Sequence, residues 1–107
     1  MYVIVRADLA PGYQIPMAIH GVVDYIYKYP EEARDWHFNS DYLVVLNVAN
    51  EDELFNLSVQ ADKLNIKQVE YREPDVDNEL VSIVLEPGNA TKKLCQHLKL
   101  ALSNLNK

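Results

Sequence analysis

Four apolar runs predict the strands of a sheet. Residues 3–5 are consecutive β-branched residues, which is typical of a strand buried on both faces. A second apolar run covers 42–48, and shorter ones cover 66–71 and 80–85. Because polar segments with proline, glycine or asparagine separate these runs, we expect four strands.

The first two helices are predicted around prolines. Apolar residues recur at helical spacing from 19 to 26, which predicts a helix that begins at Pro16 and ends near Tyr29. Proline suits the first helical turn, and Pro30 disfavours helical geometry in the residue before it. Pro30 is then expected to begin a second short helix over 31–36.

A third helix is predicted over 51–64, where apolar residues form one stripe. Asn50 is a good N-cap, and Glu53 completes a capping box. Asn65 can end the helix in a left-handed conformation. The sequence therefore marks both ends of this helix.

The alternation of strands and helices predicts an α/β fold. A last helix is expected over about residues 90–98, and residues 98–107 either extend it or form an extended tail. We expect a three-layer α/β/α sandwich around a four-stranded mixed sheet that is mostly parallel. The fourth strand follows the third too closely for a helical crossover, so these two should be antiparallel. A single domain over residues 1–107 is expected from the length.

The charge of the chain opposes nucleic-acid binding by charge alone. The composition is that of a globular protein, with 49% hydrophobic and 24% charged residues, and the net charge is −6. Residues 1–91 hold six basic and all sixteen acidic residues, whereas residues 92–107 hold four lysines and no acid. Any RNA contact is therefore expected first in the last segment.

The remaining composition excludes several function classes. The single cysteine, Cys95, has leucine neighbours, so we expect a small buried residue rather than a nucleophile. Signal-peptide features are missing, and no apolar run approaches the ~20 residues that span a membrane, so we expect a cytoplasmic protein without a membrane partner. Motifs for phosphate loops and cysteine–histidine metal sites are absent, so neither a cofactor nor a metal is expected.

A ligand site is expected at one edge of the sheet. Ligands bind beyond the carboxyl ends of parallel strands, where the loops 7–16, 48–51 and 72–79 should meet. His20 and Asp24 lie four residues apart on the first helix and could transfer protons. The alternative is a partly buried helix histidine that bonds to a neighbour.

Two further clusters stay open between a functional and a structural role. The loop after the third strand carries Glu73, Asp75, Asp77 and Glu79, with Arg72 as its one cation. These carboxylates could orient a water or hold a divalent metal, or could simply be solvated. Seven of the ten aromatic residues lie between Tyr13 and Tyr42, where they could stack on unpaired bases, complete a core or form a dimer interface.

Several segments together resemble a known family. They are the strand over 2–8, the loop over 9–13, the helix with His20, the loop over 72–75, and the segments 86–88 and 93–100. In order and spacing this set is similar to the type 2 peptidyl-tRNA hydrolases, and most of all to a divergent branch. The resemblance covers nearly the whole chain. It implies His20 and Asp75 as catalytic residues, no metal, peptidyl-tRNA or related RNA as the partner, and a homodimer.

The match to the family's motif is incomplete at the start of the helix and after the acidic loop. Gly12 matches, but Tyr13 stands in place of a lysine, Met17 in place of a glutamine and Glu79 in place of a threonine. We expect the substrate-binding residues to be Gly12, Tyr13, Asp24, Arg72 and Glu79. Arg6 and Arg72 are the candidates to replace the missing cation.

Two functions therefore remain open from the sequence. The first is hydrolysis of the ester between peptide and tRNA, in which Asp75 activates a water and His20, directly or through Asp24, assists proton transfer. Backbone N–H groups near residues 14–17 are the expected oxyanion donors. The second is a diverged module of the same fold that binds RNA or a protein partner without turnover.

Overall fold

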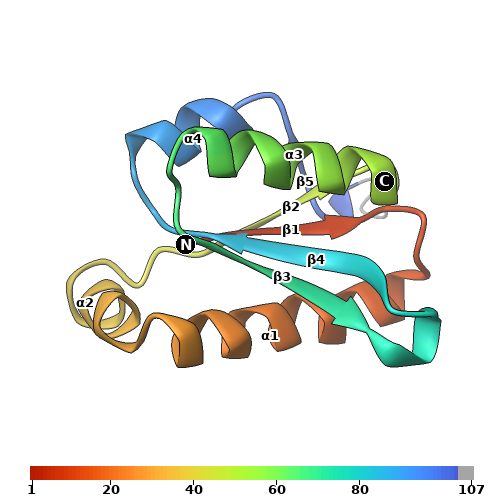
Figure 1. The fold of residues 1–107 in the computed structure, drawn as a ribbon, viewed down its shortest axis with the longest axis horizontal. Helices are drawn as coiled ribbons and strands as arrows, with labels where there is room; N and C mark the ends of the chain where they lie inside the picture. Colours follow the sequence, from red (N-terminus) through yellow and green to blue (C-terminus); the bar gives the residue numbers. More distant parts are fainter. Residues whose placement is uncertain (104–107) are drawn as a thin grey trace.

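The computed structural model describes residues 1–103, which form one five-stranded mixed sheet in the order β3-β4-β1-β2-β5 (Figure 1). The strands are β1 (Tyr2–Arg6), β2 (Val44–Val48), β3 (Gln68–Glu73), β4 (Glu79–Leu85) and β5 (Lys99–Leu100). In this part of the chain β1 and β2 pair in parallel, and the other three pairings are antiparallel. The mixed α/β class is therefore confirmed.

The prediction of a four-stranded, mostly parallel sheet is wrong. The fifth strand, β5, has two residues, which is too short to show a period-2 pattern, and it pairs with β2 at Leu46–Leu100 and Asn47–Lys99. The sheet is mostly antiparallel because β4 turns back beside β3 and then inserts between β3 and β1. The antiparallel pairing expected for the third and fourth strands is confirmed.

The helices lie on both sides of the sheet (Figure 1). They are α1 (Pro11–Lys28), α2 (Pro30–Asn39), α3 (Glu51–Lys63) and α4 (Asn89–Cys95). Figure 1 shows α1 and α2 on one side and α3 and α4 on the other. The last helix is shorter than the predicted 90–98 because the chain turns into β5, and residues 104–107 of the predicted tail lie outside the described part.

Helix α1 begins five residues earlier than predicted. Pro11, not Pro16, occupies the first helical position, and Pro16 lies inside the helix. A proline there has no N–H to donate to the carbonyl of Gly12, a loss that normally weakens a helix. The packing of α1 against the sheet outweighs this local cost. Because that packing involves residues distant in sequence, the helical pattern around Pro16 does not predict it.

The ends of α3 are as predicted. The Asn50 side chain accepts a hydrogen bond from the Glu53 N–H at 3.0 Å. The Glu53 carboxylate accepts one from the Ala49 N–H at 2.7 Å, one residue before the position that a standard capping box uses. Asn65 has a φ of 58°, the left-handed conformation expected after the helix.

Two hydrophobic clusters fill the space on either side of the sheet. Ile4 and Ile83 belong to the cluster that includes α3 residues, and Val3 and Val84 belong to the one that includes α1 and α2 residues. Cys95 lies in the first cluster, is 3% exposed, and burial raises its pKa to about 11. The low exposure confirms Cys95 as a buried residue, and the raised pKa makes its thiolate scarce at neutral pH.

Helix α1 lies very close to β4 at Gly21. A Cβ atom at Gly21 would lie 2.9 Å from Ser82 Oγ and 3.0 Å from a Val84 methyl carbon. The Ser82 hydroxyl donates a hydrogen bond to the Met17 carbonyl at 2.8 Å, one turn earlier on the helix. These contacts fix the height of α1 above the sheet and so the position of the side chains at its edge.

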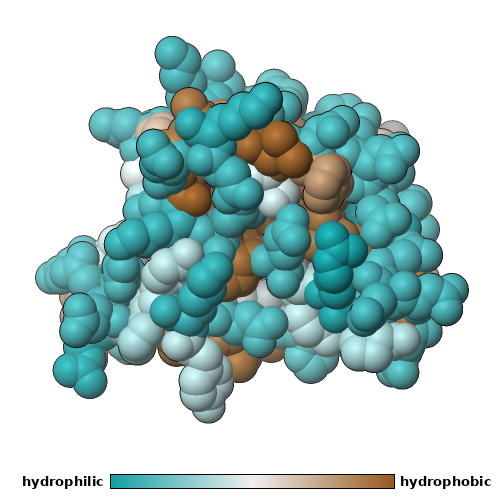
Figure 2. Space-filling model, viewed as in Figure 1, coloured by the Kyte–Doolittle hydropathy of each residue, from teal (hydrophilic) through white to brown (hydrophobic). Residues whose placement is uncertain are grey.

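One face of the molecule is mostly hydrophilic. Figure 2 shows hydrophilic residues over most of one face, with hydrophobic area gathered mainly over α3 and α4. In residues 1–103 no helix combines the length and apolar character that a membrane span requires.

Candidate functional site

The three loops expected at the site leave the same edge of the sheet. Strands β1 and β2 are parallel, so their carboxyl ends, Arg6 and Val48, are neighbours. Strand β3 runs antiparallel to β4, and β4 runs antiparallel to β1, so β3 points the same way as β1. The loop after Glu73 therefore begins at this edge too, as predicted.

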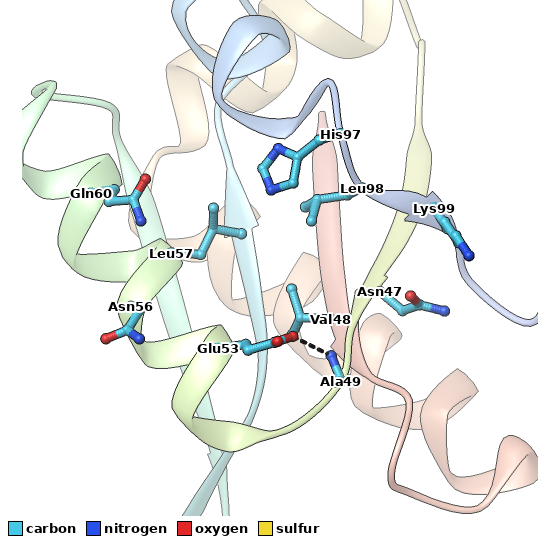
Figure 3. A pocket seen from close by; sticks show the side chains of 10 residues that line it. All are labelled: Asn47, Val48, Ala49, Glu53, Asn56, Leu57, Gln60, His97, Leu98 and Lys99. Carbon is cyan, nitrogen blue, oxygen red and sulfur yellow. Dashed lines mark hydrogen bonds between the residues drawn. The ribbon is translucent and has the colours of Figure 1, made fainter.

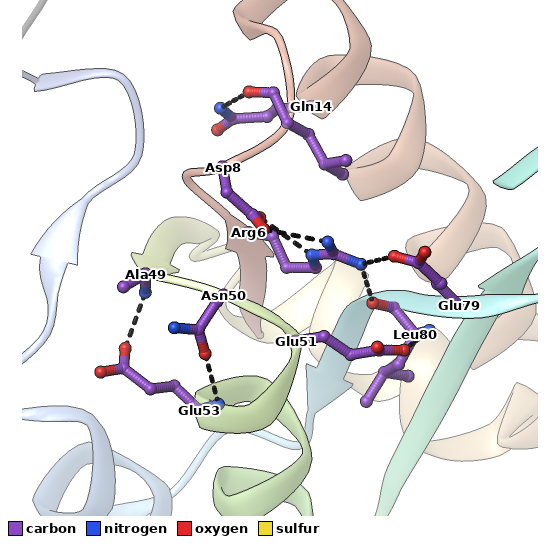
Figure 4. Close-up of polar contacts among 10 residues, drawn as sticks. Arg6, Asp8, Gln14, Ala49, Asn50, Glu51, Glu53, Glu79 and Leu80 are labelled. Carbon is purple, nitrogen blue, oxygen red and sulfur yellow. Dashed lines mark hydrogen bonds and ion pairs between the residues drawn. The ribbon is translucent and has the colours of Figure 1, made fainter.

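A buried arginine holds part of this edge together (Figure 4). Arg6 is 7% exposed and donates to both carboxylate oxygens of Asp8, at 2.9 and 3.0 Å. Its Nη1 donates to Glu79 Oε1 at 2.7 Å. The hydrogen bonds to Asp8 and then to Glu79 hold the pKa of Arg6 above its usual value, although burial opposes this. The bond from Arg6 lowers the pKa of Asp8.

The same arginine continues the sheet beyond the end of β1. The last β1–β4 pair is Val5–Ser82. Beyond it, the Leu80 carbonyl accepts from Arg6 Nη1 at 3.1 Å, and the Leu80 N–H donates to Glu51 Oε2 at 2.7 Å (Figure 4). The side chains of Arg6 and Glu51 thus supply the hydrogen bonds to Leu80 that a longer β1 would have made. The positive charge of Arg6, a candidate for the cation missing at Tyr13, is thus already paired with two carboxylates.

A second cluster forms around Tyr71 on β3. Its ring stacks on the His20 ring, with centroids 5.1 Å apart and an angle of 22° between the planes. The Tyr71 hydroxyl donates to Glu73 Oε2 at 2.9 Å, and Glu73 Oε1 accepts from the Asp75 N–H at 3.2 Å. This chain of contacts joins His20 to the turn that carries Asp75.

The electrostatics of Tyr71 show which charges surround it. Desolvation, the hydrogen bond to Glu73 and the negative charge of Glu73 raise its pKa to about 12. Asp24 and Asp75 raise the pKa further, so both carboxylates lie close enough to act on the phenol. The structure thus stacks His20 on Tyr71, and the negative charges of Asp24 and Asp75 also act on this phenol.

Tyr71 is the site residue that sequence reasoning missed, whereas Glu73 was expected as one of the four carboxylates of the acidic loop. Tyr71 lies two residues after Val69 on β3, and Val69 belongs to the cluster on the α1 side of the sheet. Since side chains alternate between the two faces of a strand, the Tyr71 side chain is expected on the α1 side, as Val69 is. The register changes between Tyr71 and Arg72, however, and no sequence pattern marks this irregularity.

The other predicted residues lie farther from this cluster or have other partners. Tyr13, His20 and Asp24 fall in one sector of α1, but Tyr13 precedes His20 by about 10 Å along the axis. Glu79 is paired with Arg6. Arg72 is exposed and lies 3.8 Å from a Glu70 oxygen.

Neither of two expected features of α1 is found in residues 1–103. No hydrogen bond joins His20 to Asp24 there, since the imidazole ring is stacked on Tyr71 instead. The expected oxyanion donors near residues 14–17 are inside the helix, because it begins at Pro11, and the Gln14 N–H already donates to the Ala10 carbonyl at 3.1 Å.

The aromatic cluster divides between core and surface. Tyr25 is buried, and Tyr29 and Trp36 pack against the same core, as the structural alternative predicts. Tyr27 and Phe38 are 82% and 76% exposed. Within the described chain, no group of three or more histidine, cysteine or acidic side chains is arranged to hold a metal ion, the acidic loop included.

We predict that Glu73→Gln lowers the pKa of Tyr71 from about 12 towards 10. The substitution removes the negative charge that opposes loss of the phenol proton, while desolvation continues to raise the pKa. The measurement is an NMR pH titration of the labelled tyrosine ring carbons, with Tyr71→Phe to assign the resonance. A Tyr71 pKa that stays at the wild-type value contradicts the placement of Glu73.

Comparison with known proteins gives a family and a fold. The family model described as "Peptidyl-tRNA hydrolase PTH2" matches residues 1–101. A solved structure of a protein of unknown function from Agrobacterium tumefaciens strain C58 is similar with a TM-score of 0.68 and 15% identity, covering 92% of this chain and 94% of that one. At this identity the likeness concerns the fold. No curated protein matches the chain. The match over residues 1–101 shows that the chain belongs to the PTH2 family of peptidyl-tRNA hydrolases.

Proposed function

We propose that this protein hydrolyses the ester that links a peptide to the ribose of tRNA. The match of residues 1–101 to the PTH2 family carries the proposal. The grouping of His20 and Asp75 around Tyr71 and Glu73 supports it, because it supplies a proton-transfer group and a carboxylate at the edge where loops converge.

In the proposed reaction Asp75 orients a water and accepts its proton. Its carboxylate is exposed, while its backbone N–H is held by Glu73. The water oxygen attacks the ester carbonyl carbon, the carbonyl oxygen becomes an oxyanion, and collapse of this intermediate breaks the bond to the ribose oxygen. His20 delivers a proton to the departing ribose oxygen and takes one up again from solvent, and Asp75 returns its proton to solvent. The products are a free peptide and a tRNA.

The start of α1 has a separate role in this proposal. Gly12 precedes His20 by eight residues, or about 12 Å along the helix, so both cannot touch the same reacting atom. Gly12 and Tyr13 are therefore proposed to contact the rest of the substrate. Asp24, whose charge acts on Tyr71, is proposed to flank the reacting centre on the α1 side, the exposed Arg72 of β3 to contact the substrate, and Glu79 to act through Arg6.

The test is hydrolysis of an N-blocked aminoacyl-tRNA labelled on the amino acid. We expect release of the blocked amino acid with turnover, in proportion to enzyme concentration. Release no faster than the spontaneous rate at high protein concentration contradicts hydrolysis. Saturable tRNA binding in that same experiment would then identify the diverged binding module.

The homodimer expected from the resemblance has a candidate surface on α1. Ile15, Ile19, Val23 and Ile26 are exposed and share one face of the helix, next to His20. We propose that a second copy of the chain covers this stripe in a symmetric contact. We also propose that the protein is cytoplasmic. Sedimentation that shows monomer alone at high concentration contradicts the dimer.

A further inference from the structure

Two cavities differ in the charge of the side chains that line them. The cavity in Figure 3, between α3 and the segment after α4, contains Lys99 and one carboxylate, Glu53, which already accepts a hydrogen bond from the Ala49 N–H. A second cavity, of about 420 Å³, lies among α1, α2 and the segment after β4. We call it the acidic cavity. Among the described residues its lining includes no lysine or arginine but four carboxylates, those of Glu31, Glu32, Asp35 and Glu86.

The acidic cavity lies at the end of the sheet opposite to the proposed reaction. Strand β4 ends at Leu85, which pairs with Tyr2 at the start of β1, and Glu86 follows it directly. The loop that carries Asp75 instead leaves the edge where β1 ends. A ligand in the acidic cavity is therefore separate from the reacting ester.

We propose that the acidic cavity binds a linear polyamine. Such a molecule carries ammonium groups that methylene chains separate, so it suits a cavity whose walls carry separated carboxylates with aromatic rings between them. A volume of about 420 Å³ lies within the range of roughly 300–1,000 Å³ that is usual for small-molecule sites. This inference goes beyond hydrolysis and does not depend on it.

The carboxylates of the acidic cavity have few positive partners. Within residues 1–103 the Lys67 ammonium pairs with Glu32, and the Lys67 backbone N–H donates to the Glu86 carboxylate. Asp35 accepts from a neutral side-chain amide at 2.6 Å. Glu31 is exposed and takes part in no ion pair of the described chain. The cavity therefore keeps an excess of negative charge, which a bound polycation would neutralise.

The spread of these carboxylates argues against a single metal ion. Glu31 and Asp35 lie one helical turn apart on α2, whereas Glu86 lies on another wall, after β4. In the part of the chain that the structure describes, no group of three or more histidine, cysteine or acidic side chains is arranged to hold a metal. Ammonium groups along one flexible chain can reach carboxylates that one small ion cannot bridge.

A buried phenol gives a second indication of a ligand. Tyr25 is 1% exposed, yet it lines the acidic cavity. Burial and then the charges of Glu86 and Glu32 raise the pKa of its hydroxyl, which therefore lies near these carboxylates, and no hydrogen bond to a described residue contributes to the shift. A buried hydroxyl without a partner costs stability, and an ammonium group of a ligand would donate to its oxygen.

An aromatic ring forms the wall beside these charges. Trp36 is half-buried, and its indole N–H donates to the Tyr42 carbonyl at 2.6 Å, which holds the ring in place. Methylene groups pack on such a ring, and an ammonium group over its face is attracted to it. The Lys67 ammonium already makes a contact of this kind nearby, 5.9 Å from the centroid of the Tyr29 ring.

The first test is a calorimetric titration of the full chain with spermidine at low salt. We expect saturable binding, and binding at least about tenfold weaker for butylamine, which has a single ammonium group, and for magnesium ions. Equal affinity for butylamine would identify a site for one ammonium group, such as a lysine side chain of a partner protein, and overturns the polyamine. Equal affinity for magnesium would show general charge screening and overturns it too.

The second test compares two double variants. Glu31→Gln, Asp35→Asn removes two carboxylates of the acidic cavity and should bind spermidine about tenfold more weakly. Asp52→Asn, Asp77→Asn is the matched control, because it removes the same charge at exposed positions outside the cavity, and it should bind as the wild type does. An equal loss in the two variants would show attraction to the overall negative charge and overturns the acidic cavity.

The third test, Tyr25→Phe, removes the phenol oxygen and keeps the ring. The urea midpoint should stay equal or rise, because a buried hydroxyl without a partner is lost, while spermidine should bind about tenfold more weakly. The chain has one tryptophan, so the emission of Trp36 reports the location and should change in step with calorimetric binding. Wild-type affinity in both Tyr25→Phe and the Glu31, Asp35 double variant overturns the acidic cavity. None of these measurements uses peptidyl-tRNA, so their failure leaves the hydrolase proposal intact, and a failure of hydrolysis leaves the acidic cavity intact.

Discussion

Asp75→Asn is expected to lower kcat for hydrolysis of N-blocked aminoacyl-tRNA by at least about 100-fold, with little change in KM. General base catalysis contributes typically 10²–10⁴-fold, and an amide cannot accept the proton of the attacking water. The backbone of the turn should persist, because the Asp75 N–H, not its side chain, bonds to Glu73. Steady-state rates on the labelled substrate give kcat and KM.

Asp77→Asn is the matched control for this substitution. Asp77 lies in the same loop, is exposed, and has a φ of 53°, a conformation that asparagine also tolerates. It removes the same charge two residues away, so a purely electrostatic effect of the acidic loop would appear in both variants. Full activity of Asp75→Asn, or an equal loss in Asp77→Asn, rejects Asp75 as the base.

Gly21→Leu is expected to destabilise the fold by about 3 kcal/mol. A Cβ atom alone would meet Ser82 Oγ and a Val84 methyl group at 3.0 Å or less, and a full side chain must force α1 away from β4. The Ser82 bond to the Met17 carbonyl would then be lost as well. Urea denaturation followed by circular dichroism measures the change.

Gly12→Ala provides the control on the same helix. A Cβ atom at Gly12 has no atom within 4 Å, and alanine is the better helix former, so stability should stay equal or rise by up to about 1 kcal/mol. If Gly21→Leu unfolds at the wild-type urea concentration, the close approach of α1 to β4 is wrong. His20 is the neighbour of Gly21 on α1, so a displacement of α1 from the sheet should also separate the His20 ring from the Tyr71 ring.

Local patterns were enough to find most elements of the fold. The apolar run of β1, the Asn50 cap and the positive φ of Asn65 depend on neighbours in sequence, and the structure confirms each of them. The features that the sequence did not predict depend on distant partners. Strand β5 exists because Lys99 and Leu100 pair with β2, and α1 tolerates Pro16 because of its packing on the sheet.

The candidate site shows the same division. His20 and Asp75 could be named from their positions in motifs, whereas the Tyr71–Glu73 link depends on the register of β3. Arg6, the last residue of β1, was one of two candidate cations. Its partner Glu79 is 73 residues away, and no local pattern could show that this charge is already engaged.

Because Glu79 forms an ion pair with Arg6, the residue at position 79 decides whether Arg6 anchors the start of β4 or leaves its positive charge exposed. With glutamate there, the positive charge at the edge of the sheet is neutralised inside the protein and holds the start of β4. A neutral side chain at this position would leave Arg6 with Asp8 as its remaining carboxylate partner and one side of the guanidinium facing the loops. One residue thus sets how positive this edge is towards an anionic substrate, while the sheet behind it stays the same.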